Sequence, residues 1–173
     1  MIHHSEIIAD LARVYRPKVY VELGLYTGEN WYKVLPYADK SFGVDIVDRS
    51  IQGGKIYIET TDKFFQHFDQ EINMAFIDAD HCFESVLKDL KSVSKLLHPQ
   101  GVIILHDTDP ESDHLFDKGY CGDAYRIVAL LQDSEEYNSI TMPVAEAGLT
   151  IITKKNNTRV YHRENNESTR LAG

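Results

Sequence analysis

The sequence has little of what marks membrane-spanning, secreted or disulfide-rich proteins. No apolar run approaches the roughly 20 residues that span a bilayer. The amino end, with His3, His4 and Glu6, lacks the basic flank and apolar stretch of a signal peptide. The two cysteines, Cys82 and Cys121, are too few for a disulfide framework and do not have the spacing of a metal knuckle. We therefore expect free thiols in a reducing, cytoplasmic setting.

Basic residues are also scarce, because Lys and Arg number 18 against 27 Asp and Glu, giving a formal net charge of −9. Binding to a phosphate backbone needs a basic face, so nucleic acids and anionic membranes are poor partners. The composition, 43% apolar and 26% charged, is that of an ordinary globular domain. A chain of 173 residues is long enough for one domain with a proper core. We therefore expect a single domain that acts on a small molecule.

Apolar runs typical of strands alternate with stretches typical of helices along most of the chain. The expected strands cover residues 18–23, 41–46, 55–59, 73–77 and 102–105. The expected helices run from a cap at Ser5 to Pro17, from Gly28 to Pro36, from a cap at Thr61 or Asp62 to Phe68, from Phe83 to Leu97, and from Ala124 to Leu131. Two further strands, 139–142 and 149–153, have no helix between them and are expected to form a hairpin.

This alternation predicts an α/β fold of the Rossmann-like, doubly wound type. Its mostly parallel sheet would have seven strands, and the C-terminal hairpin would add an antiparallel strand. Residues 1–154 would form this domain, and residues 155–173 would be a polar, flexible tail. Ligands of such sheets bind at the carboxyl ends of the strands, beside the topological switch point. The side chains at these strand ends are therefore the candidate functional residues.

The first expected strand ends in a glycine bend, from Glu22 through Gly24 to Gly28, at the start of a helix. Glycine lets the backbone approach a ligand closely, and a helix start presents free N–H groups to an anion. The spacing G-x-x-x-G differs from the G-x-G-x-x-G of nicotinamide dehydrogenases. Glu22 would repel a pyrophosphate but suit a sulfonium or ammonium group, both of which S-adenosylmethionine carries. The alternative interpretation is a plain turn between strand and helix.

Asp45 ends the second expected strand. A carboxylate at this position can accept hydrogen bonds from both hydroxyls of a ribose. Asp45 and Glu22 together therefore predict a nucleoside ligand. The alternative is a solvent-facing turn residue, a description that fits the nearby Asp48.

Ionisable residues gather after the fourth and fifth expected strands, at Asp78, Asp80, His81, His106, Asp107 and Asp109. If these strands are neighbours, Asp78 and Asp107 project into one cleft, where paired carboxylates hold a divalent cation such as Mg²⁺ or take part in acid–base chemistry. His81 is the candidate general base. A cap on the next helix is the alternative for His81, and simple packing is the favoured interpretation of His106. Residues 106–122 form a long acidic loop, which we expect to help form the acceptor pocket.

These motifs resemble those of a known family. Residues 22–28 (ELGLYTG) resemble the cofactor loop of the cation-dependent O-methyltransferases related to catechol and caffeoyl-CoA O-methyltransferases, which also have a tyrosine at the position of Tyr26. Residues 76–81 (FIDADH) resemble their Asp-Ala-Asp-Lys motif, and residues 97–108 (LHPQGVIILHDT) resemble their fifth strand. The resemblance covers residues 18–109, and it extends over the whole domain to a broader group of bacterial methyltransferases.

The resemblance implies that the protein binds S-adenosylmethionine. Its methionine part would contact Gly24, Tyr26 and Asn30, its ribose Asp45, and its adenine Ile46, Thr61 and Asp62. The full cofactor set implied is Glu22, Gly24, Tyr26, Gly28, Asn30, Asp45, Ile46, Thr61, Asp62 and Asp78. Asp78 and Asp107 match two metal ligands of the family, whose third ligand, an asparagine, is Thr108 here and whose catalytic lysine is His81.

We therefore expect methyl transfer from S-adenosylmethionine to an oxygen, rather than a nitrogen, of a small molecule or sugar. His81 would remove the proton, and Asp78 with Asp107 would hold the acceptor oxygen, alone or through a cation. The sequence lacks the amino-terminal segment that covers the active site in the plant and animal enzymes, so the site would be open or completed by a second subunit of a homodimer. The alternatives are a metal-independent methyltransferase, a non-catalytic relative, and an NAD-binding oxidoreductase.

Overall fold

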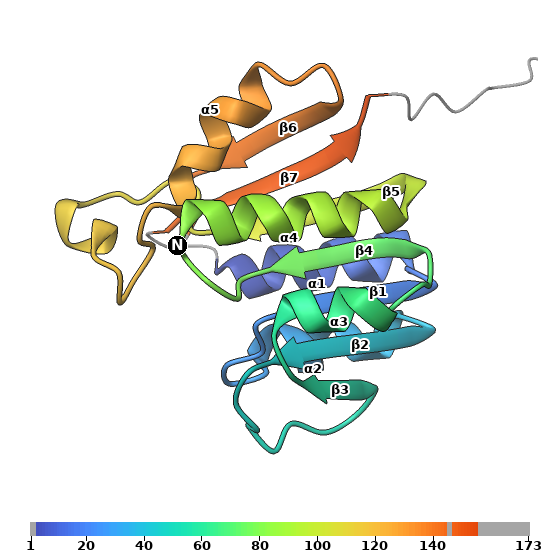
Figure 1. Cartoon of the computed structure of the whole chain (residues 1–173). Coiled ribbons are helices and arrows are strands. Elements are labelled where there is room, and N and C mark those ends of the chain that lie inside the picture. Colours follow the sequence, from blue (N-terminus) through green and yellow to red (C-terminus); the bar gives the residue numbers. More distant parts are fainter. Residues whose placement is uncertain (1–2, 145–146, 156–173) are drawn as a thin grey trace, which may run out of the picture.

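The apolar runs of the sequence form one seven-stranded sheet in the computed structural model, which describes residues 3–144 and 147–155 (Figure 1). The strands are β1 (Val19–Leu23), β2 (Lys40–Asp45), β3 (Lys55–Ile58), β4 (Ile72–Ile77), β5 (Leu97–His106), β6 (Tyr137–Met142) and β7 (Leu149–Lys154). Their order is β3-β2-β1-β4-β5-β7-β6. The first five are parallel, and β7 is antiparallel to both β5 and β6. The predicted doubly wound sheet with a terminal hairpin is confirmed.

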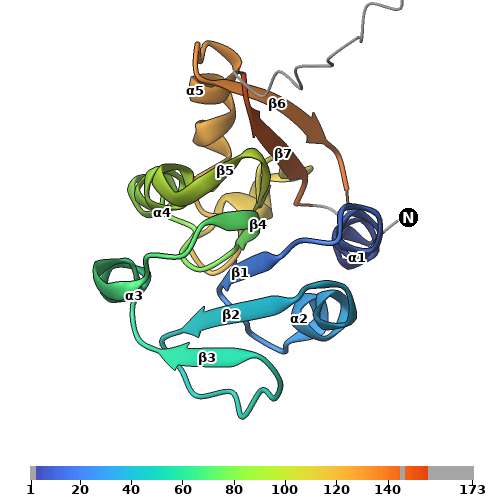
Figure 2. The same cartoon turned by 90° about the vertical axis from the view of Figure 1, so that its right-hand side faces the viewer.

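Helices cover both faces of this sheet (Figure 2). They are α1 (His4–Tyr15), α2 (Glu29–Val34), α3 (Thr61–His67), α4 (Phe83–Leu96) and α5 (Ile127–Gln132). Short 3₁₀ turns span Leu35–Tyr37, Asp113–Phe116 and Ala124–Arg126. In Figure 2, α1 and α2 lie on one side of the sheet, and α3 and α4 lie on the other.

The alternation of side chains along β1 explains why both faces need cover. Val19, Val21 and Leu23 join the apolar cluster beneath α3, α4 and α5, whereas Tyr20 joins the cluster beneath α1 and α2. Successive strand residues point to opposite faces, so a run that is apolar throughout must be buried on both. Burial of this kind supplies most of the favourable free energy of folding, and it holds the strand tips of β1, β4 and β5 in a fixed relation.

Two helix caps differ from those predicted. His3, rather than Ser5, is the N-cap of α1, because Ser5 is fully buried and its hydroxyl donates to Glu29 Oε1 over 2.7 Å. Thr60, rather than Thr61 or Asp62, is the N-cap of α3, and its hydroxyl oxygen accepts from the Lys63 N–H. Capping side chains are read poorly from sequence where several candidates lie side by side.

Strand β5 also begins earlier than predicted, directly at the end of α4. Leu97 already pairs with Ile72 of β4, and the register then shifts before Met74 pairs with Val102. The predicted polar tail, 155–173, lies outside the described residues except for Lys155. Within the described part of the chain, no helix combines the length and apolar character needed to cross a membrane.

Candidate active site

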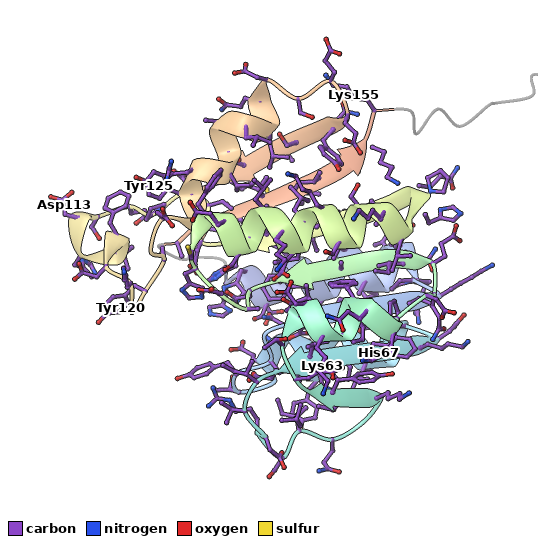
Figure 3. All side chains as sticks on the ribbon, in the orientation of Figure 1. Lys63, His67, Asp113, Tyr120, Tyr125 and Lys155 are labelled. Atoms are coloured by element: carbon purple, nitrogen blue, oxygen red, sulfur yellow. The ribbon has the colours of Figure 1, made fainter. Side chains whose placement is uncertain are left out.

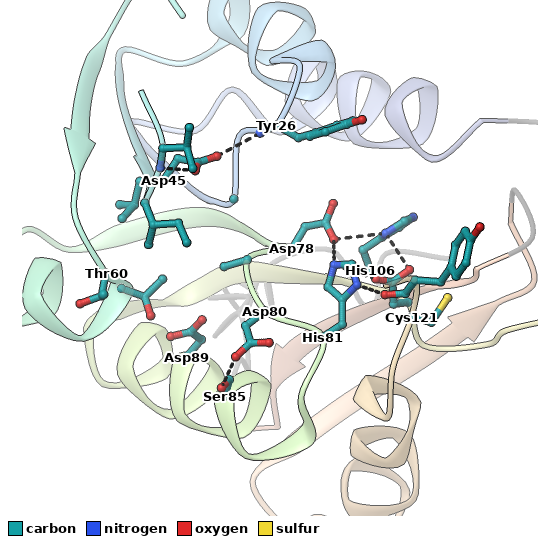
Figure 4. A pocket seen from close by; sticks show the side chains of 18 of the residues that line it. Tyr26, Asp45, Thr60, Asp78, Asp80, His81, Ser85, Asp89, His106 and Cys121 are labelled. Atoms are coloured by element: carbon teal, nitrogen blue, oxygen red, sulfur yellow. Dashed lines mark hydrogen bonds and ion pairs between the residues drawn. The ribbon is translucent and has the colours of Figure 1, made fainter. Parts of the chain in front are cut away.

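A cavity of about 890 Å³ opens at the carboxyl ends of the parallel strands, beside the switch point between β1 and β4 (Figure 4). Open α/β sheets bind their ligands at this place. Most of the predicted site residues line the cavity, namely Gly24, Tyr26, Asp45, Ile46, Thr61, Asp62, Asp78, His81 and Asp107. Glu22, Gly28 and Asn30 do not line it.

Gly24 lets the ends of β1 and β4 lie close together at this cavity. Its φ of +86° is one that side chains with a Cβ rarely adopt. A Cβ atom on Gly24 would also overlap the backbone carbonyl of Asp78 and lie 2.8 Å from the Cα of Ala79. The glycine is therefore required by the close approach of the β1 and β4 tips, and it does not need a ligand to explain it.

The Asp45 carboxylate fixes the glycine bend from the tip of β2. Oδ2 accepts the N–H groups of Leu25 and Tyr26 over 3.1 and 3.2 Å, and Oδ1 accepts the N–H of Val47 over 2.8 Å. Arg49 Nε lies 3.8 Å from Oδ2. Asp45, the residue predicted to bind the ribose, is thus held in place by backbone N–H groups that follow β1 and β2.

Glu22 lies in the core and not at the cavity wall. Its side chain is on the same face of β1 as Tyr20, whose hydroxyl donates to Oε2 over 2.6 Å, and the residue is 1% exposed. Burial raises the pKa of Glu22 to about 8, with the Tyr20 hydrogen bond opposing the shift and Asp78 adding to it. Glu22 is therefore protonated near neutral pH. This differs from the expectation of a charged carboxylate that faces a sulfonium or ammonium group.

Gly28 and Asn30 shape the start of α2. Gly28 is the N-cap, with a φ of +77°. Asn30 is buried, and its side-chain carbonyl oxygen has no hydrogen-bond partner. Neither residue lines the cavity.

Asp89 lines the cavity and was missed by sequence reasoning. It projects from α4 into the cavity and is 4% exposed (Figure 4). Burial raises its pKa to about 6, and the Thr61 hydroxyl opposes this shift. The signal was a carboxylate within the apolar stripe of α4, between Val86 and Val93, where a charged residue is unusual.

Two carboxylates and two imidazoles meet at the tips of β4 and β5 (Figure 4). His81 Nε2 lies 3.5 Å from Asp78 Oδ1 and 3.2 Å from Asp107 Oδ2. His106 Nδ1 lies 3.3 Å from Asp78 Oδ1 and 3.1 Å from Asp107 Oδ1. The two strands are neighbours, as predicted, with Ile77 paired with Leu105. His106 packs on His4 and Phe76, in line with the favoured interpretation, and its Nδ1 also contacts both carboxylates.

The cluster neutralises its own charge. The hydrogen bond with Asp78, together with the nearby Asp107 charge, raises the pKa of His81 to about 9. Burial lowers the pKa of His106, but Asp107 and Asp78 outweigh it and raise the value to about 10. Burial also raises the pKa of Asp78, and the two imidazoles reverse this and hold it well below its usual range.

The donor set of this cluster fits a divalent cation. Ligand atoms of Asp78, His81 and Asp107 all lie within 4.8 Å of one another. The Asp107 side chain is 6% exposed, and its Oδ2 accepts no hydrogen bond. Its φ of +59° is unusual for a residue other than glycine and aims the side chain into the cleft. Thr108, at the position of the family's third ligand, is buried and does not line the cavity.

The loop after β5 closes the cavity next to His81. Leu115, Gly119, Tyr120 and Cys121 line the wall, as expected for part of this loop. His81 Nδ1 is hydrogen-bonded to the Tyr120 carbonyl, and the Asp123 N–H donates to the His81 carbonyl over 3.1 Å. Figure 3 places Asp113, Tyr120 and Tyr125 together at this end of the molecule. The loop therefore fixes the orientation of the histidine ring.

The fold is one that solved structures of methyltransferases share. Residues 24–108 match the model of a family described as a methyltransferase domain. The match confirms the resemblance to S-adenosylmethionine-dependent methyltransferases. Among curated proteins, none matches the sequence.

Solved structures of methyltransferases share the fold. A Podospora anserina methyltransferase with bound S-adenosylhomocysteine is 18% identical, with a TM-score of 0.70 over 87% of this chain and 77% of that one. A putative caffeoyl-CoA O-methyltransferase from Staphylococcus aureus is 18% identical, with a TM-score of 0.71 over 89% and 85%. An rRNA methylase from Streptococcus thermophilus is 9% identical, with a TM-score of 0.69 over 89% and 98%.

Proposed function

We propose that this protein transfers a methyl group from S-adenosylmethionine to a hydroxyl oxygen of a small molecule or sugar. The observation that carries the proposal is the composition of a single cavity. At one end, Asp45 stands where nucleoside-binding sheets present a carboxylate to the ribose. At the other end, His81 and two carboxylates form an acid–base cluster.

Binding of the methyl donor is supported by the shape of the first end. Gly24 and Tyr26 would border its methionine part, while Ile46, Thr61 and Asp62 would border its adenine. Because Asp45 is already held by three backbone N–H groups, little conformational entropy would be lost when it accepts the ribose hydroxyls. S-adenosylmethionine supplies an electrophilic methyl group on sulfur, which an acceptor oxygen attacks in line as the carbon–sulfur bond breaks.

His81 is placed to take the proton of the acceptor hydroxyl. Its Nδ1–H donates to the Tyr120 carbonyl, so Nε2 is the nitrogen that exchanges a proton. Because the pKa of His81 is about 9, Nε2 must lose its own proton before it can accept one from the acceptor. Nε2 faces the two carboxylates, which stabilise the imidazolium that forms. The acceptor would lie beside Nε2, on the side of the ring that faces the two carboxylates.

Asp78 and Asp107 would hold the acceptor oxygen, and their geometry also suits a divalent cation. Such a cation would polarise the hydroxyl and offset the carboxylate charge that keeps His81 protonated. Positioning of the two reactants at contact distance would contribute several kcal/mol to the lowering of the barrier.

The charge of the protein favours a neutral or cationic acceptor over a phosphorylated one. The net charge is −9, and the cavity wall contains Asp45, Glu59, Asp62, Asp80 and Asp89. One neighbour of the same fold is an rRNA methylase, but RNA binding needs a basic face. A hydroxylated small molecule therefore remains the better candidate.

A methyl-transfer assay with S-adenosylmethionine and a panel of catechols, polyols and sugars tests the proposal. Each active compound is paired with the analogue in which its hydroxyl is already methylated. We expect S-adenosylhomocysteine to form with the hydroxyl compound and not with its methyl ether. Transfer that requires an amine or an RNA fragment would contradict the choice of oxygen.

A further inference from the structure

His106 occupies the buried side of the two carboxylates. Its Nδ1 lies 3.3 Å from Asp78 Oδ1 and 3.1 Å from Asp107 Oδ1, and its side chain is 14% exposed. His81 reaches the same carboxylates from the cavity side, where its side chain is 33% exposed. Both histidines line the cavity, and the His81 side chain is the more exposed of the two.

The second ring nitrogen of His106, Nε2, faces the protein interior next to His4. Nε2 is buried without a hydrogen-bond partner, and the ring packs on His4, with the centroids 4.2 Å apart. His4 Nδ1 is likewise buried without a partner. A histidine that binds a metal through one nitrogen usually donates its second N–H to a neighbouring acceptor. His4, at the start of α1, packs on this ring and is not hydrogen-bonded to it through Nδ1.

We propose that His106 Nδ1 is the third protein ligand of a cation that Asp78 and Asp107 hold, and that this cation is a transition ion rather than Mg²⁺. The inference rests on the proposed function, in which the same two carboxylates hold a cation. It is carried by Nδ1, which lies within 3.3 Å of an oxygen of each carboxylate. The second Asp107 oxygen, Oδ2, is buried without a hydrogen bond and faces His81 Nε2 over 3.2 Å.

The chemistry of the ligands sets the class of metal. Mg²⁺ prefers oxygen ligands, whereas imidazole suits Mn²⁺, Fe²⁺, Co²⁺ and Zn²⁺ progressively better. Thr108 stands where the related enzymes have an asparagine, and it does not line the cavity. We assign this third position to a nitrogen ligand, His106, which lies two residues before Thr108. His81 is left free to act as the base.

Calorimetric titrations with CoCl₂ and MgCl₂ test this assignment without any methyl transfer. Four proteins are compared: wild type, His106→Asn, His81→Asn and His98→Asn. His98 is the matched control, because it also lies on β5 but is at the far end of the strand from the cavity. Wild type is expected to bind Co²⁺ more tightly than Mg²⁺. His106→Asn should weaken Co²⁺ binding by at least about tenfold and Mg²⁺ binding far less, since loss of even an outer partner costs about 10–100-fold.

The control variant His98→Asn should bind Co²⁺ within about threefold of wild type, and His81→Asn should lose less Co²⁺ affinity than His106→Asn. Equal affinities of wild type for Co²⁺ and Mg²⁺, or an unchanged Co²⁺ affinity in His106→Asn, would overturn the inference. So would a loss of Co²⁺ binding in His81→Asn alone. Titration of the same proteins with S-adenosylhomocysteine separates the two proposals, because normal binding of that ligand leaves the methyltransferase function standing whatever the metal result.

A second measurement covers the case in which His106→Asn does not fold. Mn²⁺ is added to His81→Asn protein labelled with ¹⁵N-histidine, and pulsed electron paramagnetic resonance detects any imidazole nitrogen bound to the ion. We expect coupling to a directly coordinated nitrogen. Absence of that coupling, with Mn²⁺ bound, would show that His106 is not a ligand.

Discussion

The Asp45 carboxylate accepts the backbone N–H of Tyr26 over 3.2 Å, and this hydrogen bond ties the tip of β2 to the glycine bend after β1. The Leu25 N–H binds the same oxygen over 3.1 Å. One side chain therefore sets the shape of the bend and also faces the cavity in which the nucleoside is proposed to lie. Loss of this carboxylate should affect ligand binding more than it affects the rest of the fold.

Asp45→Asn should lower the affinity for S-adenosylhomocysteine by at least about tenfold. The amide keeps one oxygen, so it cannot accept both from the bend and from the Val47 N–H while accepting ribose hydroxyls as well. Asp48→Asn is the matched control, because Asp48 is exposed and only accepts from the Ser50 N–H. Isothermal titration compares the two variants, and equal affinities would argue against a ribose site at Asp45.

His81→Asn should reduce the rate of methyl transfer by about 10²–10⁴-fold, the usual contribution of a general base. Binding of S-adenosylhomocysteine should change little, because His81 lies at the acceptor end of the cavity. Wild type and His81→Asn are compared by their single-turnover rates at saturating S-adenosylmethionine. Calorimetric titration with S-adenosylhomocysteine gives the affinity of each protein for the product. A rate within a few fold of wild type would remove His81 from the mechanism.

Glu22→Gln should change how stability depends on pH. The folded pKa of Glu22 is about 8 against an ordinary value of 4.5, so between these values the unfolded chain loses a proton that the folded protein keeps. The free energy of unfolding of the wild type should therefore fall relative to the variant as pH rises through this window, by up to about 1.4 kcal/mol per pH unit.

Urea denaturation of both proteins at pH 5, 6, 7 and 8 measures this difference. The amide of the variant can also shift the free energy of unfolding by the same amount at every pH. Such a shift does not affect the test, because the Glu22 proton changes only the slope of the free energy of unfolding against pH. If the free energies of unfolding of the two proteins change in parallel over the whole pH range, Glu22 is ionised in the folded protein. Glu22 would then again be a candidate for the anionic group expected next to the ligand.

Gly24→Ala should lower the free energy of unfolding by at least about 2 kcal/mol, since it combines a strained φ with an overlap against the Asp78 carbonyl. Gly119→Ala is the matched control on the same cavity, where an added Cβ meets nothing within 4 Å. That control should be within about 0.5 kcal/mol of wild type. Thermal and urea unfolding give both values, and equal stabilities would refute the close approach of β1 and β4.

The sequence predicts the sheet well because its strands are apolar on both faces and are separated by amphipathic helices. Strand tips follow from the same pattern, so Asp45, Asp78 and Asp107 could be placed in one cleft before the structure was known. Glu22 could not be placed correctly, because an acidic residue at a strand tip is expected to face solvent. Here the Tyr20 hydroxyl supplies a buried partner.

His106 and Asp89 illustrate a second limit of sequence reasoning. Their roles depend on which side of the strand tip or helix faces the cavity, and this is set by packing between elements far apart in the chain. His106 packs against His4 of α1, and Asp89 lies beside Thr61 of α3. No local pattern contains these pairs, so only the assembled structure identifies them.

Calorimetric titration of the full chain with S-adenosylhomocysteine tests the central claim most directly. The account predicts binding at one site per chain, weakened by Asp45→Asn and unaffected by Asp48→Asn. No heat from a folded sample, over a range of temperatures and with Co²⁺ or Mg²⁺ present, would contradict the claim that this cavity holds the adenosyl ligand.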